Sequence, residues 1–167
     1  MSTTKTEPAT PAGLPRFPEE LVASTAFLLK RLGFTAKEQA LRAYEETGLS
    51  PYHYAILVAL DADTHETQGS IADALGYDRG QLVGLLDELE ERGLVVRRRD
   101  PADRRRQIVE MTPEGKRALT RLRGISQRLD NDLVSPLDPT EQRKLHALLL
   151  RLAEHHLPHC GGISPQR

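Results

Sequence analysis

The sequence predicts a mainly α-helical fold with a small two- to three-stranded antiparallel β wing. Aromatic residues make up 4% of the 167 residues and Trp is absent, so the core must consist mostly of Leu, Val, Ile and Ala, which favours helices. Apolar residues recur at helical spacing along most of the chain. The exception follows Gly93, where we expect a strand, an arginine-rich turn and a second strand ending near Thr112.

The stretch from Asp78 to Gly93 reads as a helix with one aliphatic face. Its leucines recur at i, i+3, i+4 and i+7, namely Leu82, Leu85, Leu86 and Leu89. Gly93 follows the basic residue Arg92, a combination that commonly terminates a helix. The face opposite the leucines is therefore free to contact something else.

The arginine-rich turn is basic in a chain that is mildly acidic overall. Seven arginines and two aspartates lie between Arg92 and Arg106, a local charge of +5, whereas the whole chain has a formal charge of −1. Such a run is compatible with a solvated turn, but guanidinium groups also bind phosphates through bidentate contacts. A helix able to enter a major groove, followed by a basic hairpin able to reach the adjacent backbone or minor groove, has the geometry of a winged helix-turn-helix.

The remaining elements are expected to be helices. One long helix should run from Pro18 to about Thr47, with Gly33 as the candidate position for a bend, and such a terminal helix usually needs a partner, which we take to be a second subunit. Residues 62–67 read as a polar connector. Start and stop signals place the other helices at about residues 51–62, 67–75, 113–133 and 138–156.

Composition argues against several classes of protein. The longest apolar run, from Tyr54 to Leu60, is far shorter than the roughly 20 residues that span a bilayer, so no membrane helix is expected. The sequence has no spacing typical of a catalytic triad, a phosphate-binding loop or a metal-ligand helix, which argues against an enzyme and against a bound cofactor. The single cysteine, Cys160, fits a reducing cytoplasm.

These stretches resemble the MarR family of dimeric winged-helix transcription regulators. The resemblance covers about residues 49–119 and depends on the segments LSPYHYAILVAL, IADALGYDRGQLVGLLDELEERGLVVRRRDPADRRR and MTPEG. It implies a homodimer joined by the terminal helices, a recognition helix in the major groove and a wing in the minor groove. It further implies a small-molecule pocket between the two lobes in many members, and double-stranded DNA with a pseudo-palindromic operator as the partner.

The resemblance assigns roles to residues of the wing. Arg105 would enter the minor groove, Asp103 would orient it, and Arg104 and Arg106 would lie beside phosphates. Alternatively, Asp103 and Arg105 pair only to close the turn. The two interpretations are compatible, because the same pair would hold the arginine in a pointing rotamer.

Three consecutive arginines occupy the strand before the turn: Arg97, Arg98 and Arg99. Side chains alternate along a strand, so only some of the three can reach DNA. We select Arg99 as a DNA contact and regard Arg98 as the weakest candidate. Asp87, on the preceding helix, is expected to pair with a neighbouring arginine.

Three positions open the predicted recognition helix: Arg79, Gly80 and Gln81. Arg79 is the best candidate there for a phosphate or guanine contact. Gln81 suits a bidentate contact to adenine, but it also lies three residues after Asp78 and would instead complete a capping box. Gly80 and Gly84 each cost about 1 kcal/mol in helix propensity relative to Ala, which indicates either close backbone approach to DNA or a soft helix.

Two further sets of residues raise the question of ligand binding. Phe27, Tyr52 and His53 are candidates for a ligand pocket, since family pockets lie where the first two helices meet the recognition lobe; ordinary interhelical packing and a surface histidine are the alternative. Near the C-terminus, four residues of the types that bind metals form a cluster: His155, His156, His159 and Cys160. A metal site there is disfavoured, because Pro158 interrupts the cluster and the spacing matches no compact zinc motif.

Together these expectations define five segments and a function. The segments are a disordered tail (1–16), an N-terminal dimerisation helix (17–48), a winged helix-turn-helix lobe (49–112), C-terminal dimerisation helices (113–157) and a loose tail (158–167). The expected function is that of a homodimeric, sequence-specific DNA-binding transcriptional repressor, relieved by a small phenolic or other organic effector. The alternative is a winged-helix protein–protein interaction module whose wing binds an acidic partner.

Overall fold

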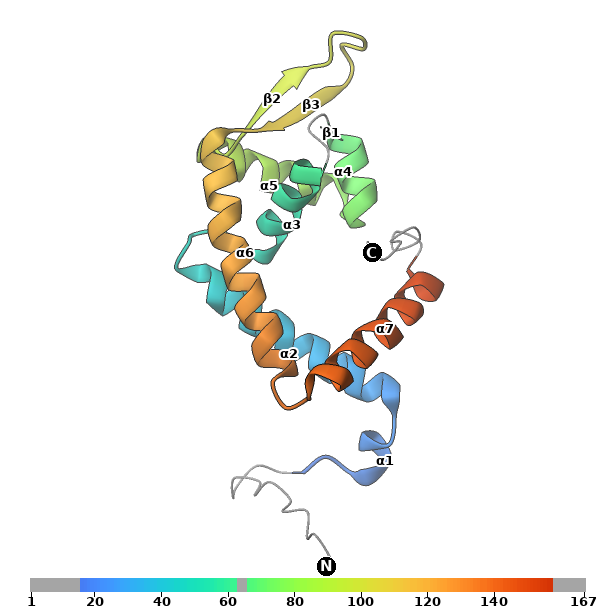
Figure 1. The fold of residues 1–167 in the computed structure, drawn as a ribbon. Helices are drawn as coiled ribbons and strands as arrows, with labels where there is room; N and C mark the ends of the chain where they lie inside the picture. Colours follow the sequence, from blue (N-terminus) through green and yellow to red (C-terminus); the bar gives the residue numbers. More distant parts are fainter. Residues whose placement is uncertain (1–15, 63–65, 158–167) are drawn as a thin grey trace, which may run out of the picture. The chain divides into compact units, whose positions relative to one another are not determined.

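A computed structural model of the chain describes residues 16–62 and 66–157. The elements follow in the order α1 (Glu19–Val22), α2 (Thr25–Glu45), α3 (Pro51–Ala62), β1 (Glu66–Thr67), α4 (Gln68–Leu75), α5 (Arg79–Glu91), β2 (Val95–Arg99), β3 (Gln107–Met111), α6 (Pro113–Val134) and α7 (Pro139–His156) (Figure 1). They belong to two compact units, Met1–Thr35 and Ala36–Arg167, each of which is described by itself.

The segment expected to be one long helix contains two. α1 ends at Val22, and α2 begins at Thr25 and continues through Gly33 to Glu45. The new helix starts beside Ser24, whose hydroxyl oxygen accepts a hydrogen bond from the backbone N–H of Phe27 at 3.3 Å. Serine competes with the helix for backbone hydrogen bonds and favours the start of a new one. The prediction of a single helix was therefore wrong, and its break lies at Ser24.

The helix start and stop signals act as the sequence predicts. At the first turns of α4 to α7, where these signals place helix starts, backbone N–H groups donate to the side chains of the N-cap residues Thr67, Asp78, Thr112 and Asp138. Gly76 and Gly93 have φ angles of 65° and 69°, a left-handed conformation that favours glycine. These two residues end α4 and α5, and so fix the length of the helix-turn-helix.

The wing belongs to a three-stranded antiparallel sheet with the order β1-β3-β2. β2 pairs with β3 from Val95 opposite Met111 to Arg99 opposite Gln107. β1 pairs with the other edge of β3, so that residues 66–67, expected to belong to a polar connector, form a short strand instead. The expectation of a mainly helical fold with a two- to three-stranded wing is confirmed.

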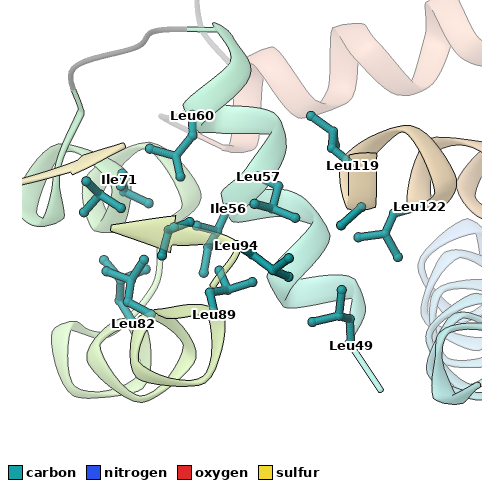
Figure 2. Packing of buried hydrophobic residues seen from close by; sticks show 14 of the residues in the cluster. Leu49, Ile56, Leu57, Leu60, Ile71, Leu82, Leu89, Leu94, Leu119 and Leu122 are labelled. Carbon is teal, nitrogen blue, oxygen red and sulfur yellow. The ribbon is translucent and has the colours of Figure 1, made fainter. Parts of the chain in front are cut away.

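The core of the second unit is aliphatic. Figure 2 shows residues of α3, α4, α5 and α6 that converge on it, including Ile56, Leu57, Ile71, Leu82, Leu89, Leu119 and Leu122. Three of the four leucines predicted to line one face of α5 are at most 1% exposed: Leu82, Leu86 and Leu89. This burial holds α5 in place and leaves its opposite face in solvent.

The start of α6 packs tightly against the base of the wing. The Thr112 hydroxyl donates a hydrogen bond to the carbonyl oxygen of Gly93 at 2.7 Å and accepts one from the N–H of Gly115 at 3.0 Å. A Cβ atom at Gly115 would overlap the carbonyl oxygen of Leu94. The TPEG segment is therefore explained by packing, because only glycine lets the helix approach the strand this closely.

Some sequence-based expectations lie outside the described residues. These are the disordered tail up to residue 15, the loose tail from residue 158 and the metal question at His159 and Cys160. Within residues 16–62 and 66–157, no group of three His, Cys, Asp or Glu side chains is placed to hold a metal ion. None of the helices in these ranges has the length and hydropathy needed to cross a membrane.

Candidate nucleic-acid interface

Arg79, Gly80 and Gln81 form the exposed first turn of α5. Asp78 fixes this turn, because its Oδ1 atom accepts the backbone N–H of Gly80 at 2.8 Å and that of Gln81 at 3.3 Å. The return bond of a capping box, in which the Asp78 N–H would donate to the Gln81 side-chain oxygen, is absent between these two described residues. The capping alternative for Gln81 therefore has no support in the geometry, and its amide is free to read a base.

Beyond this turn, the exposed surface of α5 has open space at Gly84. A Cβ atom at Gly84 would meet nothing within 4 Å, and one at Gly80 would lie 3.1 Å from Oδ1 of Asp78. Packing within the protein therefore does not require glycine at position 84. A bare backbone on the exposed side of a helix lets another molecule approach closely.

The wing tip is closed by hydrogen bonds from its own backbone. Oδ1 of Asp103 accepts the N–H of Arg105 at 3.0 Å, and Oδ1 of Asp100 accepts the N–H of Ala102 at 2.8 Å. The N–H of Asp100 donates to the carbonyl oxygen of Arg106 at 3.0 Å, which joins the two ends of the turn. Asp103 thus holds the backbone of Arg105, whose guanidinium group has no partner among the described residues.

The arginines predicted to contact DNA are unpaired within the described part of the chain. No ion pair or side-chain hydrogen bond there involves the guanidinium groups of Arg79, Arg99, Arg104, Arg105 or Arg106. All five residues are exposed. Unpaired, always-charged groups on a closed turn are available to phosphates.

A hollow of about 560 Å³ lies where β1, α4, α5 and the wing meet. We call it the wing hollow; Arg79, Arg105 and Arg106 line it together with the first turn of α4. The structure therefore brings three of the predicted contacts around one concave surface. Gly80, Gln81, Arg99 and Arg104 are not part of its lining. Sequence reasoning missed Gln68 and Gln107, which do line it, because neither lies in the basic run or on the recognition helix.

Arg97 is not available to a ligand. Its Nε atom donates to Oε2 of Glu90 at 2.9 Å, its backbone N–H donates to Oε1 at 3.1 Å, and a terminal nitrogen lies 2.6 Å from Oδ1 of Asp87. The hydrogen bonds from Arg97 hold the pKa of the Glu90 carboxyl below its ordinary value. The expected pairing of Asp87 with an arginine is confirmed. Arg98, chosen as the weakest candidate, lies 3.6 Å from Glu110 and is otherwise exposed.

His53 is buried, and its contacts define its tautomer. Its Nδ1 atom accepts the N–H of Ser50 at 3.0 Å, so a neutral ring carries its proton on Nε2, which lies 3.2 Å from Oε2 of Glu88. Burial lowers the pKa of His53 below its usual 6.5, and Glu88 opposes that shift without reversing it. The approach of Nε2 to Glu88 is not a hydrogen bond, so Nε2 is a buried polar atom without a hydrogen-bond partner among the described residues.

The other two predicted ligand-binding residues have aromatic neighbours. The Tyr52 ring packs edge-to-face on that of Tyr77, with centroids 5.9 Å apart. Phe27, in the first unit, packs in the same manner against Phe17 at 5.2 Å. Phe27 belongs to a different unit from Tyr52 and His53, and so is not assigned to a common site with them.

A second cavity, of about 220 Å³, is lined by α3, α6 and the part of α2 from Ala36 onward. We call it the helix cavity. Its polar lining comprises Gln39, Tyr44, Tyr54, Ser126 and Asp130, none of which the sequence singled out as a ligand-binding residue. Pattern reasoning could not find this set, because its members come from three helices, lie between residues 39 and 130, and follow ordinary helical periodicity.

In this chain an exposed helix, α5, is held by a buried leucine face and is followed by a basic wing. This arrangement defines the class of winged helix-turn-helix proteins. A model of the MarR family matches residues 47–106. The putative transcriptional regulatory protein for the hcr operon of Thauera aromatica is 35% identical over 133 residues, covering 79% of this chain and 80% of that protein. The chain therefore belongs to the MarR family, whose members are transcriptional regulators and not enzymes.

Solved structures agree with this assignment. The transcriptional repressor CouR, bound to a 23-mer DNA duplex, is 33% identical and superposes with a TM-score of 0.75, covering 81% of this chain and 96% of that chain. CouR from Rhodococcus jostii RHA1 bound to p-coumaroyl-CoA is 32% identical with a TM-score of 0.69, again covering 81% and 96%.

Proposed function

We propose that this regulator is a cytoplasmic homodimer that represses transcription by binding a pseudo-palindromic operator through α5 and the wing. The observation that carries the proposal is the arrangement of Arg79, Arg105 and Arg106 around the wing hollow, beside the exposed first turn of α5. Arg105 enters the minor groove, Asp103 fixes its backbone, and Arg99, Arg104 and Arg106 contact phosphates. Gln81 reads a base in the major groove, and Gly80 permits close approach.

Dimerisation is supported by exposed leucines on the terminal helices. α7 has no buried residue, and four of its leucines are 37–45% exposed: Leu145, Leu148, Leu149 and Leu152. In the first unit, Leu28, Leu29 and Leu32 of α2 are 41–55% exposed. Contiguous apolar faces of this kind are typical of protein–protein contacts. Two recognition helices presented by a dimer would read half-sites roughly 34 Å apart.

We also propose that a small organic effector relieves repression by binding in the helix cavity. Tyr52 and His53, the other expected ligand contacts, share the first turn of α3 with the lining residues Pro51 and Tyr54 but are not part of the lining. CouR, which this chain resembles, has been solved with p-coumaroyl-CoA. An effector can release DNA only by binding better to a dimer geometry in which the recognition helices are wrongly spaced.

A gel shift tests the DNA-binding function. The full chain is titrated into a labelled fragment from upstream of its own coding sequence, with an excess of unrelated competitor DNA. We expect a discrete complex that a charge-reversed variant, Arg79→Glu with Arg105→Glu, does not form. If the unrelated competitor DNA abolishes the complex and the same arginines capture an acidic protein, the protein–protein module would be supported instead.

A further inference from the structure

The helix cavity contains one charged group. Among the residues that line it, Asp130 is the only acidic side chain, and none is Lys, Arg or His. Asp130 is exposed and forms no ion pair with another described residue. A carboxylate without a partner at the edge of a partly enclosed space attracts a cation and repels an anion.

Two basic side chains on the surrounding helices contact other partners. The Lys37 ammonium group lies 5.9 Å from the centre of the Tyr52 ring. Arg123, on α6, donates to Oδ2 of Asp61 at 2.7 Å. Neither group lines the cavity, so neither neutralises the charge of Asp130 there.

The aromatic lining also suits a cation. The rings of Tyr44 and Tyr54 lie 5.9 Å apart at an angle of 47°, and ring faces attract ammonium groups. Burial, followed by the influence of Tyr54, raises the pKa of Tyr44 to about 12, and the Asp130 charge acts in the same direction. The Tyr44 hydroxyl, which donates to the carbonyl oxygen of Leu122 at 3.4 Å, therefore stays neutral and adds no second negative charge.

The remaining lining is apolar and the space is small. Ala36, Ala40, Leu129 and Leu133 offer methyl and methylene groups to a hydrophobic body. The volume of about 220 Å³ is below the roughly 300–1,000 Å³ of pockets that enclose drug-sized ligands. A compact ligand with a single ring fits these dimensions, whereas a nucleotide-bearing thioester would have to extend outside.

We infer that the effector of this regulator is a compact organic amine, bound in the helix cavity with its ammonium group at Asp130 and its apolar body among the alanines and leucines. This inference depends on the proposed function, because it assumes that the helix cavity holds an effector. The inferred effector is a cation, so it differs in charge from a phenolic acid or from the thioester of an organic acid. A carboxylate in this cavity would find no basic partner in the lining and would face Asp130.

Three ligands with one skeleton and different charge test the inference. They are tyramine, 3-(4-hydroxyphenyl)propionate and the neutral alcohol 2-(4-hydroxyphenyl)ethanol, titrated into the full-length dimer by calorimetry. We expect tyramine to bind at least about tenfold more tightly than either of the other two ligands, because one charge pair near a protein surface contributes at least that much binding free energy. Asp130→Asn should remove that preference. Asp132→Asn, on the same helix but outside the cavity lining, should leave it intact.

Operator release, followed by fluorescence anisotropy with the same ligands, separates two kinds of failure. If the carboxylate binds as tightly as the amine, or if Asp130→Asn leaves the amine affinity unchanged, the assignment of a cationic effector is overturned while the cavity stands as an effector site. If none of the three binds and none changes operator affinity, the helix cavity is not the effector site. The proposed effector site and the inferred cationic effector are then both overturned. Tight binding of tyramine that also releases the operator supports both.

Discussion

Arg97 in β2 holds both carboxylate oxygens of Glu90 in α5, one through its backbone N–H at 3.1 Å and the other through Nε at 2.9 Å. The contact joins the recognition helix to the first strand of the wing. Arg97 has only 19% of its side chain exposed, while that of Glu90 is 38% exposed. The angle between the two DNA-binding elements is thus fixed by a charged pair at the edge of the core.

Replacing Glu90 with Gln should destabilise the fold modestly. The variant keeps the shape of the side chain but removes the charge from its hydrogen bonds with Arg97, each of which is worth about 1.5–3 kcal/mol when a charged group takes part. Because the Glu90 carboxylate is more than a third exposed, solvent screening reduces the expected loss to about 1 kcal/mol. Urea denaturation at neutral pH measures it, with Glu91→Gln as an exposed control on the same helix.

The same pair predicts a pH dependence. Arg97 lowers the pKa of Glu90 below its ordinary value of 4.5, so the unfolded chain takes up a proton on this carboxyl before the folded chain does. The stabilisation is fully present above pH 4.5 and is lost as the pH falls through the lower, folded-state pKa. Glu90→Gln should therefore show a shallower loss of stability on acidification than the wild type. Parallel curves for the two proteins would contradict a role for the pair.

Arg105→Ala should weaken binding to every DNA sequence and lower the salt dependence of binding by about one phosphate per subunit. The reason is that Asp103 holds the Arg105 backbone at 3.0 Å while its guanidinium group stays unpaired among the described residues. Affinity measured against salt concentration gives the slope. Arg98→Ala is the matched control, since Arg98 is near Glu110 and should change the slope less. An unchanged slope in Arg105→Ala would contradict the assignment of Arg105 as a DNA contact of the wing.

The elements that sequence could predict are those set by local signals. The leucine face of α5 and its Asp78 cap follow from periodicity and from cap chemistry, and the structure confirms both. Ser24 also carries a local signal, but it lies inside a strong helical pattern that obscured it. Alternation along β2 could exclude some of its arginines yet not identify Arg97 as the paired one, because its partner Glu90 comes from a helix whose packing is tertiary.

Gln81→Ala should relax the preference for one base in each half-site with little change in stability. Asp78 caps α5 through the backbone N–H groups of Gly80 and Gln81, so the cap does not need the Gln81 side chain. A change of no more than about 0.5 kcal/mol in unfolding free energy is expected for such an exposed residue. Selection of bound DNA from a random pool, for wild type and variant, measures the preference. An identical selected sequence would show that Gln81 reads no base.

Gly84→Ala should stabilise the protein but weaken operator binding. A Cβ atom at this position meets nothing within 4 Å, so the variant gains about 1 kcal/mol of helix propensity without a clash. Bound DNA approaching the bare backbone of α5 would, however, meet the added methyl group. Gly124→Ala in α6 is the matched control, because its Cβ makes only an ordinary contact, at 3.8 Å with Arg128, and lies away from the wing hollow. Thermal unfolding and operator affinity are measured for both variants. Both should gain stability, and only Gly84→Ala should lose affinity; equal affinity in the two would leave a soft recognition helix as the reason for Gly84.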